Sequence, residues 1–349
     1  MHQASSDTHH AAVRRWLWAV LLTIVAIVAV GGITRLTQSG LSMVRWEPLM
    51  GVLPPIGEAQ WVERFAQYQQ YPEYRQLRPD MTIDEFKVIF FWEYMHRLVA
   101  RALGIVFLVP WLWFLWTGRL TRRLALRTLG VFVLGAAQGA LGWFMVASGL
   151  VDRPSVSHFR LAAHLGLAFV IVGAVVWILC DMEAPHRQRH AAMPAPARRT
   201  LRRGATLVGV LLAVQIAWGA FVAGLDAGLG YNTFPLMGGR LVPLHAFTLE
   251  PWVANLIQHP VGVQWMHRVL GTILLIAAGG VALRARDLTT ESRLRQLPMV
   301  FAATIAAQYA IGIVTLLWAV PVALASIHQL VALGLVAIWV AWMHALRAG

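Results

Sequence analysis

The sequence predicts an all-α polytopic membrane protein, with eight transmembrane helices arranged as two pseudo-symmetric four-helix bundles. Hydrophobic residues make up 58% of the 349 residues and charged residues only 13%, and the mean hydropathy is +0.61. Soluble domains of this size are normally far more polar. Apolar runs long enough to cross a bilayer recur along the chain. They lie at 14–34, 90–117, 127–148, 160–180, 205–224, 264–283, 298–318 and 321–346.

The first apolar run is interpreted as a retained helix. It extends from Trp16 to Ile33 after Arg14 and Arg15, and at about 18 residues it is longer than the apolar part of a signal peptide. No small-residue cleavage site follows it. The preceding tail lacks the Arg- and Ser-rich composition of a mitochondrial transit peptide. We therefore expect a bacterial inner membrane.

The net charge of +13 comes largely from arginines in short connections between apolar runs. A nucleic-acid-binding protein would instead carry them as a stripe on one folded face, so this class is not indicated. The arginines gather at 119–127, 187–203 and 284–295. By the positive-inside rule these connections and both termini are cytoplasmic. The long segments 35–89 and 225–263 are then periplasmic.

A helix start is encoded near the end of the first long segment. Thr82-Ile83-Asp84-Glu85 has the spacing of a capping box, in which a Thr side chain and a Glu side chain satisfy backbone N–H groups reciprocally. The second transmembrane helix is therefore predicted to begin here, well outside the hydrocarbon.

The two halves of the chain repeat each other in order. Four separate motifs recur, which indicates an internal duplication. Because each half has an even number of helices, both halves have the same orientation. The predicted division is 1–180, an arginine-rich cytoplasmic linker at 181–205, and 206–349. The first motif, Ser39-Gly40-Leu41 with Pro48–Gly51, recurs as Ala227-Gly228-Leu229 with Pro235–Gly238, and the second, Met95-His96-Arg97, recurs as Met266-His267-Arg268. The third, Ala136-Ala137-Gln138 with Gly142, recurs as Ala306-Ala307-Gln308 with Gly312, and the fourth, His164, recurs as His328.

Four histidines, His96, His164, His267 and His328, lie near or within predicted spans. Ionisable groups at membrane depth are costly and need a partner or a function. Each histidine stands 17 to 23 residues from the cytoplasmic end of its helix. At about 1.5 Å per residue this is roughly 25 to 35 Å, against a hydrocarbon core of about 30 Å. All four are therefore predicted at the periplasmic edge.

These histidines are predicted to form two pairs, His96 with His164 and His267 with His328. Their helices run in the same direction, so each half holds two imidazoles at one depth, which suits the two axial positions of a haem iron. A zinc or non-haem iron site would normally recruit carboxylates or thiolates as well. The second half has none at this depth, and the single cysteine, Cys180, excludes a CxxC motif. A lone histidine at a helix end would more simply be an interfacial residue, but repetition favours haem. The remaining histidines outside the N-terminal tail are taken as surface residues: His158, His186, His190, His245, His259 and His344.

Two arginines directly follow histidines of the pairs, Arg97 after His96 and Arg268 after His267. At the outer interface such side chains can simply reach toward water. Beside a haem, a guanidinium can instead pair with a propionate carboxylate.

The halves differ three residues before the first histidine of each pair, where Glu93 stands in one and Gln264 in the other. This spacing places each side chain on the same helical face as its histidine. A partly buried carboxylate could take up protons or stabilise positive charge during a reaction. The alternative is a structural ion pair with Arg97. The asymmetry suggests that a haem is chemically altered in the first half and held as a fixed cofactor in the second.

Motifs over almost the whole chain resemble the haem A synthase family, in the subgroup that includes the mitochondrial and related bacterial enzymes. Cysteine pairs in periplasmic loops mark the other subgroup and are absent from this sequence, so no role of a loop disulfide applies. The motifs are Gly31–Thr37, Ser39–Ser42, Gly51–Pro55, Phe91-Trp92-Glu93 with His96-Arg97, Gly142-Trp143, Ser148–Val151 and Tyr231–Met237.

The resemblance implies an oxidoreductase that oxidises the C8 methyl group of haem O to a formyl group, giving haem A for cytochrome oxidase. It implies that His96 and His164 flank the iron of the substrate haem, with Glu93 assisting the oxidation. It also implies that His267 and His328 ligate a haem b. Haem O synthase and cytochrome oxidase assembly factors are the partners to be expected, while the sequence identifies no electron acceptor.

Two other functions remain open at the level of sequence. A di-haem b-type cytochrome would pass electrons between quinol and a periplasmic acceptor, and a haem O carrier would release its ligand unchanged. Both would bind haem in the same places. Glu93 favours the enzyme, because a carrier of electrons has no need for an acid in only one half.

Overall fold

The computed structural model describes residues 2–44, 53–147, 149, 154–183 and 193–347. Within these residues the chain is helical, and the only β-type pairing is an isolated bridge between Met237 and Arg240. The repeat segment Pro48–Gly51 lies outside the described residues. The α-helices are α1 (His2–Leu36), α2 (Glu58–Tyr68), α3 (Pro72–Leu77), α4 (Ile83–Trp116), α5 (Arg122–Ala147), α6 (His158–Glu183), α7 (Ala195–Gly224), α8 (Ala254–Ile257), α9 (Pro260–Leu288), α10 (Ser292–Leu317) and α11 (Val322–Ala345).

Eight of these helices have the length and apolar composition needed to cross a membrane: α1, α4, α5, α6, α7, α9, α10 and α11. Each coincides with one of the eight apolar runs in the sequence, so the predicted all-α multi-pass membrane fold is confirmed. The predicted linker at 181–205 is shorter than expected, because α6 continues to Glu183 and α7 already begins at Ala195.

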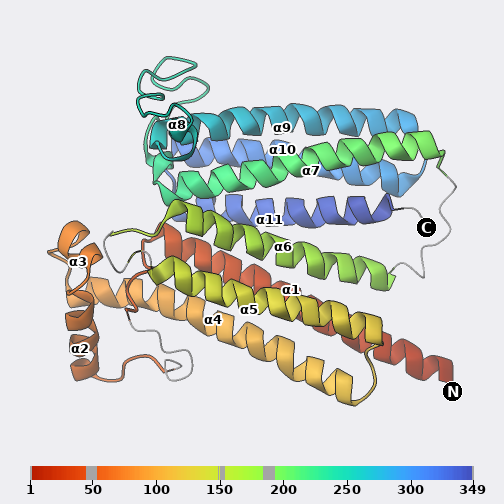
Figure 1. Cartoon of the computed structure of the whole chain (residues 1–349), viewed down its shortest axis with the longest axis horizontal. Helices are drawn as coiled ribbons and strands as arrows, with labels where there is room; N and C mark the ends of the chain where they lie inside the picture. Colours follow the sequence, from red (N-terminus) through yellow and green to blue (C-terminus); the bar gives the residue numbers. More distant parts are fainter. Residues whose placement is uncertain (1, 45–52, 148, 150–153, 184–192, 348–349) are drawn as a thin grey trace.

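The spanning helices form two layers (Figure 1), with α1, α4, α5 and α6 in one and α7, α9, α10 and α11 in the other. The layers meet where α6 packs against α7 and α11 and where α1 packs against α11. Each layer has its own apolar core, centred on residues such as Val172 and Val175 in the first and Val208 and Phe301 in the second. Burial of these side chains between helices positions the polar residues discussed below.

The first long connection is not a simple loop. It contains α2 and α3, which pack on the start of α4 through an aromatic cluster that includes Tyr68 and Phe86. The predicted capping box is confirmed: the backbone N of Thr82 donates to Glu85 Oε2 over 2.8 Å, and Thr82 Oγ1 accepts from the backbone N of Glu85. This cap starts α4 several turns before its histidine.

Two histidines predicted at the surface are in fact packed between the layers. His344 is only 6% exposed, with Nε2 2.8 Å from Asp181 Oδ1. Asp181 also pairs with Arg127 and Arg347. His158 is half-buried and its Nε2 lies 2.8 Å from the carbonyl oxygen of residue 257. The surface prediction was wrong for both because helix ends from different halves meet there, whereas His245 is exposed as predicted.

Candidate functional site

The four predicted histidines lie on four different helices and meet in two pairs. His96 on α4 and His164 on α6 are close enough for their imidazoles to interact electrostatically. The same holds for His267 on α9 and His328 on α11. The structure therefore brings together the members of each predicted pair, one pair in each layer.

A glycine on a neighbouring helix makes room for each of these imidazoles. An ideal Cβ atom built at any of the four glycines would lie no more than 3.2 Å from a ring atom of the histidine. A larger residue would therefore push the ring away. The four combinations are Gly31 with His96 (2.9 Å), Gly142 with His164 (3.0 Å), Gly219 with His267 (3.2 Å) and Gly312 with His328 (3.0 Å).

Glutamines hold the backbone of three of the histidines. Each lies four residues before one of these glycines, and its Nε2 donates to the carbonyl oxygen of the histidine. On α1 the corresponding position is Ile27. Gln138 and Gln308 are part of the repeated motifs, but the sequence did not show their role. Gln215 could have been found from the sequence because it has the same four-residue spacing to a glycine. The bonds join Gln138 to His164 (2.9 Å), Gln215 to His267 (3.1 Å) and Gln308 to His328 (2.8 Å).

The surroundings of the histidines suit an axial ligand better than a cluster of metal-binding side chains. The Nδ1 atoms of His164 and His328 are buried without a hydrogen-bond partner among the described residues. Among the residues that the structure describes, no group of three or more His, Cys, Asp and Glu side chains could hold a metal ion. Two imidazoles per site, with space cleared by glycine, fit a porphyrin iron.

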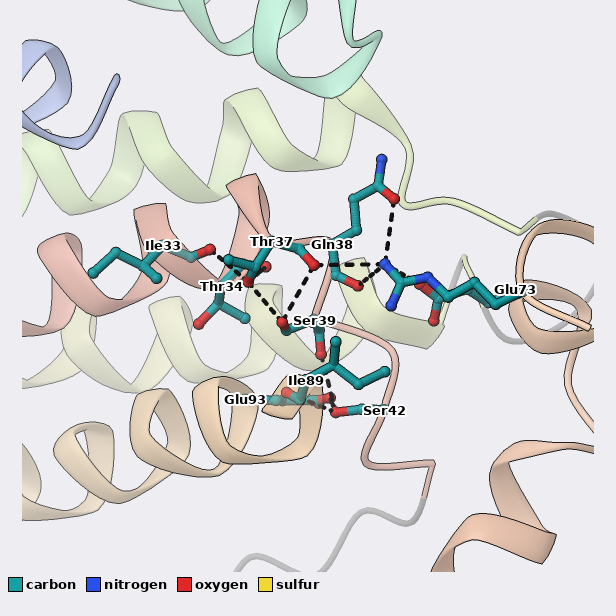
Figure 2. Close-up of polar contacts among 10 residues, drawn as sticks. Ile33, Thr34, Thr37, Gln38, Ser39, Ser42, Glu73, Ile89 and Glu93 are labelled. Carbon is teal, nitrogen blue, oxygen red and sulfur yellow. Dashed lines mark hydrogen bonds and ion pairs between the residues drawn. The ribbon is translucent and has the colours of Figure 1, made fainter. Parts of the chain in front are cut away.

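Glu93 is 3% exposed and its carboxylate accepts three hydrogen bonds. Ser42 Oγ and the backbone N of Met43 each lie 2.7 Å from Oε2, and Arg97 Nη2 lies 2.6 Å from Oε1. Figure 2 shows Glu93 and Ser42 together, with Ser39 and Thr37 beyond them. The ion pair with Arg97 considered from the sequence is therefore present, and Ser42 is a partner that the sequence did not reveal.

Gln264 occupies the same place in the second half with the opposite hydrogen-bond role. It is also 3% exposed, and its Nε2 donates to the carbonyl oxygen of Gly230 over 2.6 Å. The acid and the amide thus both fasten the segment that follows the first helix of their half, but only Glu93 is a carboxylate, three residues before the first histidine of its pair.

Arg97 and Arg268 also fasten these segments. Arg97 Nη2 donates to the carbonyl oxygen of Met43 over 2.8 Å. Arg268 donates to the carbonyl oxygens of Tyr231 and Thr233 over 2.8 and 2.7 Å. This anchoring role was not predicted, because the spacing of residues within one helix does not show which loop folds back over it.

The fold and site define a class of protein, a multi-pass helical membrane protein with a pair of buried histidines in each layer. The model of the COX15-CtaA family, described as cytochrome oxidase assembly protein, matches residues 14–340. The chain belongs to this family.

Several similar proteins carry the name heme A synthase. The relative from Chelativorans sp. is 47% identical over 92% of this chain and 87% of its own length. The relative from Rhodospirillum centenum is 44% identical over 96% of this chain and 88% of its own. The relative from Nitrosospira multiformis is 43% identical over 95% and 92%. The similarity therefore covers both layers.

Proposed function

We propose that this chain is a haem A synthase, an oxidoreductase that converts the C8 methyl group of haem O to a formyl group and so supplies haem A to cytochrome oxidase. The observation that carries the proposal is the buried carboxylate of Glu93 three residues before His96, where the second half has Gln264 three residues before His267. The names of the relatives agree with it.

In this proposal the first layer binds the substrate. His96 and His164 would hold the iron of haem O and so fix the ring relative to Glu93. Glu93 holds or moves a proton at its carboxylate oxygens during the oxidation. Ser42 and Arg97 keep that carboxylate in one orientation through their bonds to Oε2 and Oε1.

The second layer would hold a haem b between His267 and His328. The orphaned Nδ1 of His328 and the spaces at Gly219 and Gly312 support this assignment. A haem b, when bound, supplies one-electron redox chemistry. The chain's own contribution is to fix the imidazoles through Gln215 and Gln308 and to keep water away by helix packing.

Residues 1–180 and 206–349 would thus be the substrate and cofactor halves, with Arg97 and Arg268 close to the propionates. The composition of the N-terminal tail favours a bacterial inner membrane, and the arginine-rich connections favour an orientation with both termini in the cytoplasm. Haem O synthase and cytochrome oxidase assembly factors are the partners that this function calls for.

The experiment is to express the chain together with haem O synthase in cells that lack haem A, and to identify the extracted haems by chromatography and mass. The proposal expects haem A, or haem O hydroxylated at C8. Haem O alone, with the protein folded and haem-loaded, would favour the di-haem cytochrome or the carrier.

A further inference from the structure

The two layers close differently around their histidine pairs. In the second layer α7, α9, α10 and α11 form a complete ring, in which α9 packs closely against α10. In the first layer α1 packs against α4 and α6, and α5 packs against α6, but α4 and α5 make few contacts with each other. The seam between α4 and α5 is therefore the weakly packed side of the first bundle.

The contacts that α4 and α5 do make lie near the short connection that joins them. Trp111 Nε1 donates to Thr128 Oγ1 over 2.9 Å, and the rings of Phe107 and Phe132 are 5.7 Å apart. Phe107 is eleven residues after His96, or about three helical turns. Both of these contacts therefore lie toward one end of the seam, about three helical turns from the depth of His96.

In the second layer a tyrosine closes the corresponding seam. Tyr309 on α10 bonds through its hydroxyl to Thr272 Oγ1 on α9 over 2.8 Å. A Cβ atom at Gly271 would lie 3.6 Å from the Tyr309 ring, so the ring covers the α9 backbone there. This pair joins α9 to α10 beside the site.

The repeat identifies the residues that replace this pair in the first layer. Tyr309 follows Gln308, and Gly139 follows Gln138, which makes the same bond to its histidine. Thr272 stands five residues after His267, and Arg101 stands five after His96. The closing pair is therefore replaced by Arg101 and Gly139.

On the α5 side the replacement leaves space. Gly139 is exposed, and no atom lies within 4 Å of a Cβ built there. It is also adjacent in sequence to Gln138, whose side chain is bonded to His164. Gly139 is therefore an open position on α5, one residue away from the side chain that holds His164.

We propose that the seam between α4 and α5 at Arg101 and Gly139 is a lateral portal, through which a lipophilic porphyrin enters the first layer from the bilayer and leaves it again. The inference rests on the proposed function, in which the first layer exchanges substrate for product while the second keeps its haem. A ligand that turns over needs such a path, whereas a permanent cofactor is better retained by a closed ring of helices.

The test is to build the closing pair of the second layer into the first. In the double variant Gly139→Tyr, Arg101→Thr, the proposal expects uptake of haem O from liposomes by the purified protein to slow by about tenfold or more. Haem b content should stay unchanged, and haem A formation should fall in parallel with uptake. The single variant Arg101→Thr measures how much of any change in uptake comes from loss of the arginine and not from closure of the seam.

Gly130→Tyr is the matched control. Gly130 is exposed on α5 with open space around it, but nine residues before Gly139 it faces the opposite side of the helix. This variant should take up haem O at the normal rate. Equal uptake by the double variant, Gly130→Tyr and the unmodified protein would overturn the proposal.

A reversible closure covers the case in which the double variant fails to fold. Arg101→Cys and Gly139→Cys, in a chain with Cys180→Ser, are joined by a flexible bifunctional thiol reagent that a reductant cleaves. The proposal expects uptake to be blocked when joined and restored on reduction. The same uptake in both states would refute the portal. Failure of the unmodified protein to make haem A while it still takes up haem O would count only against the proposed function.

Discussion

Glu93 and Ser42 are joined by a hydrogen bond of 2.7 Å between Oε2 and Oγ. Both side chains are buried, at 3% and 2% exposed. The bond ties a carboxylate on α4 to the turn that follows α1, so the orientation of the acid depends on a residue fifty-one positions away in sequence.

Glu93→Gln should keep bound haem but slow the oxidation on the order of a hundredfold, because an amide cannot take up the proton that a carboxylate can. The measurement is the ratio of haem A to haem O in extracts. Gln264→Glu, at the equivalent place, is the control and should leave the rate of oxidation largely unchanged. Haem A production at the normal rate by Glu93→Gln would contradict the inference that the difference between Glu93 and Gln264 makes the first half the site of oxidation.

His267→Ala should abolish tight binding of haem b, because an axial ligand is lost from a site with only two imidazoles. The absorption spectrum of the purified protein measures this loss. His245→Ala, which changes an exposed histidine, should retain the full spectrum. A His267→Ala protein with full haem b content would place the cofactor elsewhere.

Gly312→Ala should weaken haem b binding, since the added Cβ would lie 3.0 Å from Cε1 of His328 and displace the ring. Overpacking of this kind costs about 1–3 kcal/mol. Gly334→Ala on α11 meets open space and should leave binding unchanged. Titration of the haem-depleted proteins with haem b would compare the two affinities, and equal values would contradict the role given to Gly312.

The α2–α3 region should lose stability as the pH rises. Burial raises the pKa of Glu73 to about 7, although Arg78 acts in the opposite direction. Between the ordinary pKa of glutamate, about 4.3, and this value, the folded state binds the proton more tightly than the unfolded state. Stability is therefore fully present below about pH 4, decreases as the pH rises toward 7, and levels off above it.

Hydrogen exchange of α2 and α3 at pH 5 and pH 8, compared with Glu73→Gln at the same pH, measures this effect. The variant should be protected equally at both values after correction for intrinsic exchange. An unmodified protein that shows the same pH response as Glu73→Gln would rule the titration of Glu73 out as its cause.

Asp181→Ala should loosen the junction between the layers, because the carboxylate pairs with Arg127, His344 and Arg347. Removing the hydrogen-bond partner of a buried group such as His344 costs about 1–3 kcal/mol. Thermal unfolding in detergent is the measurement. Asp287→Ala, an exposed acid near the end of α9, should leave the unfolding temperature nearly unchanged, and an equal effect of both variants would argue against the junction.

Much of the fold could be read from the sequence because a bilayer imposes a length and a composition on each helix. The eight spans and the cap at Thr82 follow from local residues alone. The site was predictable to the extent that depth in the membrane depends on position along a helix, so the four histidines could be paired. Gln215 was not identified because the equivalent position in the first half is Ile27 on α1, so the repeat shows no matching glutamine.

The sequence by itself determined the spans, the order of the repeated motifs and the difference between Glu93 and Gln264. Only the tertiary structure decided how Ser42 reaches Glu93, that His344 is buried against Asp181, and that the seam at Gly139 lacks the closure made by Tyr309. The physical reason is that these contacts depend on the rotation and separation of helices distant in sequence, which side-chain packing across the whole bundle sets.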